Sequence, residues 1–255
     1  MAGHLKNCLC KETHMKAIHT TAIIFAAAST VATADVVDMK FTGTGAGQNV
    51  RIQIGDNNAF NVFAGELKHE IANATGVDQY LNGEHRTFCA DVNEHVSGNF
   101  SQYQTEQLEN IPLTSSNYTP MTSTQANAIR ALYSQSNNTL MAGGLSNAFS
   151  AAMQITVWEI VNDFDGSADS INLNAGLLTF TATNSGALDA GVLAQVESFK
   201  TQIMTGLNLG QSGPDKVIGL ANAGAQDQLV AVPTPGALSL LASAGLIAVR
   251  RRRAV

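Results

Sequence analysis

The hydrophobic positions of the chain change from a period of two to a period of three or four towards its middle. Between Val36 and Phe63, β-branched and aromatic residues form three short runs, residues 36–41, 50–54 and 60–63, separated by segments rich in Gly, Asn and Asp. This pattern predicts strands joined by hairpins. Residues 86–92 predict another strand, and residues 173–183 are β-like in composition.

Three segments in the second half of the chain have helical periodicity. The first begins at Thr122, where Thr-Ser-Thr-Gln has the form of a capping box before an apolar run. The second covers residues 146–162, and the third covers about 16 residues over 188–203. Within the second helix, Gln154 and Trp158 are four residues apart, so we expect them to share one face.

Strands at both ends with helices between them predict a single α+β or β-sandwich domain that carries a helical insert. Residues 207–232 are rich in Gly, Asn, Gln and Ala, and we expect a linker there with a final strand at 228–232. The segment 43–47, Gly-Thr-Gly-Ala-Gly, is not followed by a helical pattern as a phosphate loop would be. We expect it to be a mobile turn.

The two ends of the chain look like targeting segments. Residues 21–29 are a short apolar run behind the basic Lys16, and Ala32-Thr33-Ala34 has the small-x-small form that signal peptidases accept. We therefore expect residues 1–34 to be a signal peptide, with Met1 or Met15 as the start and Asp35 as the first mature residue.

At the other end, Val232-Pro233-Thr234-Pro235 is followed by fourteen apolar or small residues, 236–249, and then by four arginines, 250–253. This arrangement resembles a PEP-CTERM sorting tail over residues 233–255, although Thr234 replaces the glutamate of that signature. The resemblance implies transient anchoring in the inner membrane, arginines on the cytoplasmic side, and a membrane protease, exosortase, that acts on the tail. A plain C-terminal membrane anchor is the alternative.

Charge excludes one class of partner. The whole chain has a net charge of −6, but half of its 14 basic groups lie in the two end segments. Residues 35–249 therefore carry 7 basic and 19 acidic groups, a net charge of −12. Such a surface repels phosphate backbones, so we expect no nucleic-acid partner.

Cysteine usage singles out one residue. Cys8 and Cys10 precede the predicted cleavage site, so the mature chain keeps Cys89 alone and has no intramolecular disulfide. A single cysteine in an exported protein leaves three interpretations: an intermolecular disulfide, a buried inert thiol, or a reactive group.

Two short segments favour the reactive group. Phe88-Cys89-Ala90 is followed much later by Met153-Gln154-Ile155-Thr156-Val157-Trp158, and together they resemble the thioester domains of bacterial surface adhesins. In that family an aromatic-Cys-small tripeptide and an apolar-Gln-x-x-apolar-Trp segment supply the two halves of an internal thioester. The resemblance implies that Cys89 donates the sulfur and Gln154 the acyl group, with Phe88 and Trp158 flanking and shielding the bond. It also implies a thioester-type domain over residues 35–206, with a β-sandwich or barrel-like fold.

A secreted cysteine hydrolase or transferase is an alternative, because His85, Asp91 and His95 are close to Cys89 in the sequence. On a strand, Asp91 would share a side with Cys89, whereas the two histidines would lie in loops beyond its ends. His95 would be the base of such an enzyme, but solvated histidines are the simpler expectation. A metal site from His85, Cys89 and His95 lacks the usual close ligand spacing, and we expect neither a metal nor a cofactor.

An acidic segment has an incomplete calcium-loop pattern. Asp163, Asp165, Ser167 and Asp169 alternate as in a calcium loop, but the sixth position is not glycine and the twelfth is not glutamate. We expect a solvated acidic turn, and an irregular calcium site stays open as the alternative.

The resemblances together imply an exported protein of the cell surface or extracellular matrix. It would act once, as a covalent binder rather than an enzyme, on a target that bears amines or hydroxyls. A non-reactive matrix protein with an inert Cys89 is the second hypothesis, and the cysteine enzyme is the third.

Overall fold

The computed structural model describes residues 35–113, 119–210 and 216–232. The predicted signal peptide and sorting tail lie outside the described residues. In chain order the strands are β1 (Val36–Ile54), β2 (Phe60–Ala72), β3 (Gly83–Cys89), β4 (Ser101–Glu106), β5 (Leu178–Ala182), β6 (Val217–Ala221) and β7 (Gln228–Ala231). The α-helices are α1 (Ser123–Ala142), α2 (Asn147–Asp163) and α3 (Ala190–Asn208), and short 3-10 turns lie at Gly76–Leu81, Leu108–Asn110 and Ala168–Ser170.

The strands form one antiparallel sheet that closes on itself. The order is β2-β3-β7-β6-β4-β1-β5, and β1 also pairs with β2 along most of its length. Because β1 pairs with β4 through residues 36–39, the strands β1, β2, β3, β7, β6 and β4 make a closed ring. The α+β expectation is confirmed, with a barrel-like closure that leaves these strands no free edge along the ring.

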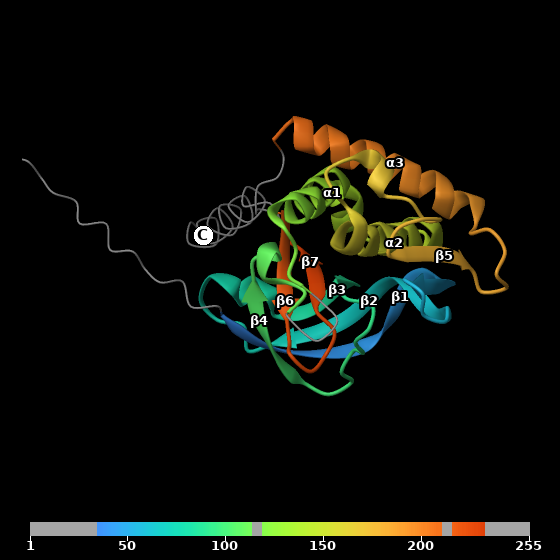
Figure 1. The fold of residues 1–255 in the computed structure, drawn as a ribbon. Helices are drawn as coiled ribbons and strands as arrows, with labels where there is room; N and C mark the ends of the chain where they lie inside the picture. Colours follow the sequence, from blue (N-terminus) through green and yellow to red (C-terminus); the bar gives the residue numbers. More distant parts are fainter. Residues whose placement is uncertain (1–34, 114–118, 211–215, 233–255) are drawn as a thin grey trace, which may run out of the picture. The chain divides into compact units, whose positions relative to one another are not determined.

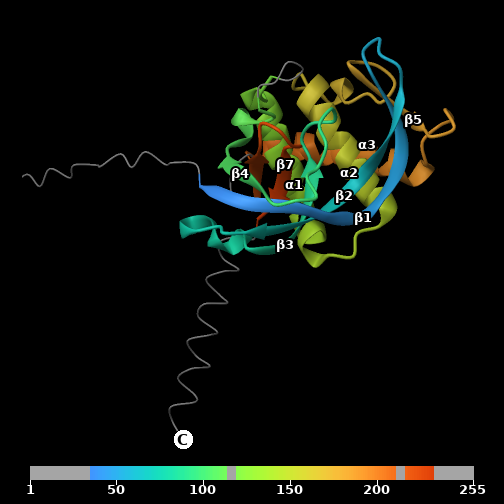
Figure 2. The same cartoon turned by 90° about the horizontal axis from the view of Figure 1, so that it is seen from below.

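The helices gather on one side of the strands, with β5 next to α2 (Figure 1). Seen from below, β1 and β2 curve together towards the helices (Figure 2). The larger core cluster lies between helices and sheet and includes Phe88, Ile155 and Phe199. A smaller cluster, with Met39 and Tyr103, is built from ring strands and fills the barrel.

The helix signals in the sequence are confirmed. Thr122 caps α1 with a capping box, because its hydroxyl accepts from the Gln125 main-chain N–H and the Gln125 side chain accepts from the Thr122 N–H. The Ser146 hydroxyl caps α2 by accepting from the Phe149 N–H at 3.1 Å. The third helix continues to Asn208, a few residues past its expected end.

The expectation for residues 36–63 is wrong in one respect. The runs 36–41 and 50–54 belong to one 19-residue strand, and the glycine-rich segment 43–47 lies inside it rather than in a turn. Irregular pairing with β2 bends the strand there. Gly47 faces Gly65, and a Cβ on either residue would lie 2.5 Å from a carbonyl oxygen of the opposite strand. The glycines therefore permit a close contact between two strands.

We expect Gly65→Ala to lower the free energy of unfolding by about 1–3 kcal/mol, because its methyl group would overlap the Ala46 carbonyl oxygen. Chemical denaturation measures the change. Gly98→Ala is the matched control, since a Cβ at position 98 meets no atom within 4 Å. Equal denaturation midpoints for the two variants would show that β1 and β2 can move apart to fit the added methyl group without destabilising the fold.

Residues 207–232 are not a linker. The segment contributes β6 and β7, which close the ring between β4 and β3. The final strand expected at 228–232 is present as β7, whereas β6 and β4 had no strong signal in the sequence. The folded domain therefore extends to the end of the described residues. Within those residues, no helix has the length and apolar character needed to cross a bilayer.

Candidate functional site

Cys89 is the last residue of β3, opposite Gln228 of β7. Its thiol is free and only 2% of the residue is exposed. The pairing of β3 with β2 ends at Thr87, so the side of Cys89 away from β7 has no strand partner. A side chain from another element is able to occupy that position.

Gln154 occupies that position from the middle of α2. This helix is buried on all sides from Ser150 to Val161, because it packs between strands of the sheet and the helices α1 and α3. Gln154 is 1% exposed. Its carboxamide oxygen accepts the Cys89 main-chain N–H at 2.8 Å, and its carboxamide nitrogen donates to the Cys89 carbonyl at 2.8 Å. The side chain thus pairs with the end of β3 as a neighbouring strand would.

The Cys89 sulfur has two polar neighbours. Its thiol donates to the Asp91 main-chain carbonyl, and the Trp158 indole N–H donates to the sulfur at 3.5 Å. Burial, and next the nearby Asp91 carboxylate, raise the pKa of the Cys89 thiol well above its usual value, although the Trp158 hydrogen bond opposes this. The resting group is therefore a protonated thiol. Its ionisation requires a proton acceptor.

Cys89, Gln154 and Trp158 line one pocket of about 330 Å³. Its walls are mostly apolar, with side chains from β1, β2 and the loop after β3, and its polar lining includes Glu94, His95 and Gln226. The apolar walls are Phe41, Phe60, Val62, Phe63, Leu67, Val92, Val96 and Trp158. Cys89 and Gln154 are themselves buried, so a bond between their side chains would lie in low-dielectric surroundings.

The two flanking aromatics of the motif lie in different places. Trp158 lines the pocket and stacks on Phe180 of β5, with ring centroids 6.3 Å apart. Phe88 is buried at a different small pocket, beside Tyr133 and Leu140 of α1. Aromatic residues of β1 and β2, which the sequence did not single out, line the Cys89 pocket together with Trp158.

Of the three residues named in the cysteine-enzyme alternative, Asp91 and His95 lie at the site of Cys89 and His85 does not. Asp91 is buried beyond the end of β3, and its main-chain oxygen accepts the Cys89 thiol. His85 lies in β3 opposite His69, away from the pocket lining. His95 is exposed and lines the pocket that holds Cys89. The expectation of two loop histidines is therefore wrong for His85, which is a strand residue.

Two buried carboxyl groups brace the loop after β3. The Asp91 carboxylate accepts the main-chain N–H of Asp227 at 2.7 Å and that of Glu94 at 3.2 Å. The Asp227 carboxylate accepts those of Asn222 at 2.7 Å and Leu113 at 2.6 Å. Burial raises the pKa of Asp91 to about 7 and that of Asp227 to about 6. Asp227 gave no signal in the sequence, because an acid in a polar segment looks like a surface residue.

Two further buried groups titrate far from their usual values. Glu159 of α2 is fully buried, and one of its oxygens accepts the Asn172 N–H at 2.8 Å. Burial raises the pKa of Glu159 to about 8. His69 is 1% exposed, its Nδ1 contacts the Thr87 hydroxyl at 2.9 Å, and burial lowers its pKa to about 4.

These shifts predict how stability depends on pH. Asp91, Asp227 and Glu159 bind protons more tightly in the folded chain, so the free energy of unfolding should rise as pH falls from about 8.5 to 6.5. His69 binds its proton less tightly when folded, so its contribution is lost as pH falls from about 6.5 to 4. Urea denaturation at several pH values should show this rise. Glu159→Gln should make the free energy of unfolding less dependent on pH between pH 7 and 8.5. An unchanged pH dependence in this range would mean that other groups cause it.

Neither of the two alternative metal sites considered from the sequence has a supporting cluster in the described residues. Within the described ranges, no group of three or more His, Cys, Asp or Glu side chains is arranged to hold a metal ion. In the acidic segment, Asp163 accepts the main-chain N–H groups of Leu177 and Leu178, and Asp165 accepts from Ser167. These carboxylates stabilise turns of the chain.

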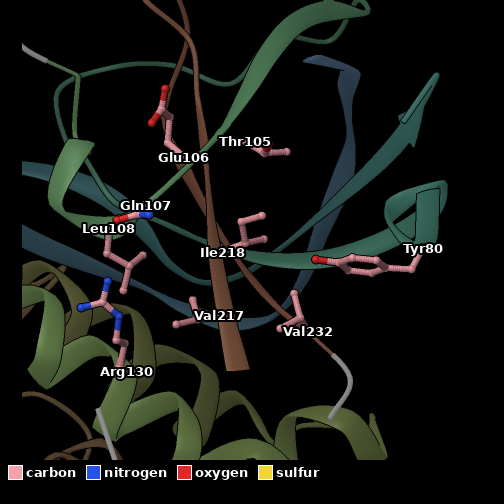
Figure 3. Close-up of a pocket in the computed structure, with 9 residues that line it drawn as sticks. All are labelled: Tyr80, Thr105, Glu106, Gln107, Leu108, Arg130, Val217, Ile218 and Val232. Carbon is pink, nitrogen blue, oxygen red and sulfur yellow. The ribbon is translucent and has the colours of Figure 1, made fainter. Parts of the chain in front are cut away.

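A second pocket, of about 240 Å³, lies between Tyr80 and Arg130 against β6 (Figure 3). Its cation is already paired, because both terminal nitrogens of Arg130 contact the Glu109 carboxylate, at 2.7 and 2.6 Å. This ion pair lowers the pKa of Glu109. The pocket contains no thiol, so the pocket of Cys89 is the stronger candidate site.

No protein-family model, no curated protein and no solved structure matches this chain. The candidate site therefore stands on its geometry and on the sequence motifs.

Proposed function

We propose that this protein is an exported surface protein with a thioester-domain fold that forms an internal thioester between Cys89 and Gln154. It uses this bond once, for covalent attachment to amine or hydroxyl groups of a surface or matrix target. The observation that carries the proposal is the pair of 2.8 Å hydrogen bonds between the Gln154 carboxamide and the Cys89 main chain, in a buried position.

Bond formation joins the Cys89 sulfur to the Gln154 carboxamide carbon. The bond from that carbon to its nitrogen breaks, and the nitrogen leaves as ammonia with the thiol proton. Negative charge develops on the carboxamide oxygen during the attack. The Cys89 main-chain N–H already donates to that oxygen at 2.8 Å, so it supplies the stabilisation that an oxyanion hole provides.

The fold must offset an unfavourable exchange, because an amide is more stable than a thioester in water. Holding two reacting groups in contact contributes about 7–11 kcal/mol relative to free reactants. Gln154 is fixed by two hydrogen bonds and by the packing of α2, so little freedom remains to be lost. The burial of Cys89 and Gln154 slows hydrolysis, because it limits the access of water to the bond.

The exported location is part of the proposal and comes from the two ends of the chain. The signal-peptide pattern of residues 1–34 and the PEP-CTERM-like pattern of residues 233–255 indicate export, transient membrane anchoring and a sorting protease as a partner. A covalent binder is useful at a surface, where flow or dilution would remove a weakly bound protein.

One observation favours the cysteine enzyme as a second candidate, namely that His95 lines the pocket of Cys89. The hydrogen bonds of the thiol weigh against it, since they join the sulfur to Asp91 and Trp158 rather than to an imidazole. A non-reactive matrix protein does not require a buried carboxamide held at the cysteine.

Covalent capture of a tagged amine tests the proposed function. Freshly purified protein is incubated with biotinylated cadaverine, denatured and digested, and the peptides are identified by mass spectrometry. We expect one amine per chain, linked to the side chain of Gln154, with Cys89 released as a free thiol. No adduct at Gln154 would contradict the proposal, and continuous turnover of a small ester would favour the enzyme.

Trp158→Phe isolates the role of the indole N–H. The phenyl ring keeps an aromatic contact with Phe180 but loses the hydrogen bond to the Cys89 sulfur. A hydrogen bond to a charged group contributes about 1.5–3 kcal/mol, so thioester formation after refolding should be about 10–100-fold slower. Time-resolved intact mass measures the rate. An unchanged rate would show that Trp158 contributes packing at the site and that its indole N–H does not assist bond formation.

A further inference from the structure

The mouth of the Cys89 pocket contains few groups that exchange protons. Among the residues that line it, only Cys89, Glu94 and His95 carry titratable side chains. The lining residues from β1, β2, α2 and the segment before β7 are apolar or neutral. Cys89 is buried, Glu94 is half-buried and His95 is exposed. His95 is therefore the basic group nearest to solvent in this pocket.

The loop that carries His95 is tied to the reactive cysteine. The Gln226 main-chain N–H donates to the His95 carbonyl at 3.1 Å. The Gln226 side chain donates to the carbonyls of Glu94 at 2.9 Å and Asp91 at 3.1 Å. The Asp91 carbonyl also accepts the Cys89 thiol. One glutamine thus holds both the pocket rim and the carbonyl that contacts the sulfur.

Opening of a thioester in this pocket requires proton transfers. An incoming amine must lose a proton as its nitrogen bonds to the Gln154 carbonyl carbon, and the sulfur must gain one as its bond to that carbon breaks. Departure as a bare thiolate is unfavourable here because the sulfur is buried among apolar walls and close to the Asp91 carboxylate. A group in the pocket that accepts the proton of the amine and then donates a proton to the sulfur lowers the free-energy cost of both steps.

We propose, on the basis of the function proposed above, that His95 is this proton carrier for the opening reaction. Its imidazole accepts the proton of the attacking amine, the nitrogen–carbon bond forms, and the carbon–sulfur bond breaks. The same proton then passes to the Cys89 sulfur, so the products are an amide at Gln154 and a neutral thiol. Imidazole suits this task because its charge changes between pH 5 and 8.

The experiment compares opening by methylamine in wild type and in His95→Ala at pH 8. Intact mass is measured before methylamine is added, so that only loaded protein is followed. We expect His95→Ala to load fully and to open about 100-fold more slowly. Added imidazole should restore the rate of His95→Ala and leave wild type unchanged.

His85→Ala is the matched control, because His85 lies in β3 outside the pocket lining. It should open at the wild-type rate. A rate ratio for His95→Ala that stays near one, or a slowed rate that added imidazole does not restore, would overturn the role of His95 while leaving the thioester intact. Wild type without a mass deficit would instead overturn the thioester itself.

Discussion

Cys89→Ser is expected to give a folded protein that captures no amine. Serine keeps a hydrogen-bond donor for the Asp91 carbonyl and is close in size to cysteine, so the buried site should survive. A neutral hydroxyl is a far weaker nucleophile than a thiolate, and an ester is a poorer acylating group than a thioester. Amine capture should therefore fall at least about 100-fold, to the background of the assay.

Gel fluorescence with a labelled amine measures this loss, and far-UV circular dichroism checks the fold. Cys89→Ala removes both nucleophile and donor and should behave in the same way in the capture assay. Capture by Cys89→Ser at a rate close to that of wild type would mean that the acyl donor is not activated by Cys89, which would remove the sulfur from the mechanism.

Gln154→Glu is expected to remove the thioester and also to destabilise the fold. A carboxylate cannot donate to the Cys89 carbonyl, which would lose its 2.8 Å donor, and it would place a charge where only 1% of the residue is exposed. An unsatisfied buried polar group costs about 1–3 kcal/mol, and a buried charge costs more. In a Cys89→Ser background, which forms no thioester and keeps the carboxamide, we expect Gln154→Glu to lower the free energy of unfolding at pH 8 by about 3 kcal/mol or more, with part of the loss recovered at pH 5 when the acid protonates.

Gln102→Glu is the matched control, since Gln102 is exposed on β4. It should leave unfolding and amine capture unchanged within about 0.5 kcal/mol. Equal stability of Gln154→Glu and Gln102→Glu at pH 8 in the Cys89→Ser background would show that the carboxamide pairing at position 89 does not stabilise the domain.

Local signals in the sequence predicted the helices well. The capping box at Thr122 and the serine at position 146 fix the starts of α1 and α2, because each hydroxyl satisfies an N–H group within three residues. The pairing of Gln154 with Cys89 was expected only from the motif resemblance. Residues 65 positions apart meet through the packing of α2 against the sheet, which no local pattern encodes.

Long-range contacts explain what the sequence did not predict. The glycines at 43–47 looked like a turn, but Gly47 is required by the close approach of Gly65 from another strand. Strand β6 is short and contains Gly219, so only its partners β4 and β7 define it. His95 and Gln226 line the same pocket as Cys89 because β3 and β7 are neighbours.

The intact mass of freshly purified protein, compared with that of Cys89→Ser prepared in the same way, tests the thioester most directly. After correction for the substitution, wild type should be lighter by one ammonia, and digestion at low pH should yield the Cys89 peptide joined to the Gln154 peptide. Wild type of full mass, with Cys89 alkylated quantitatively once unfolded, would contradict the account.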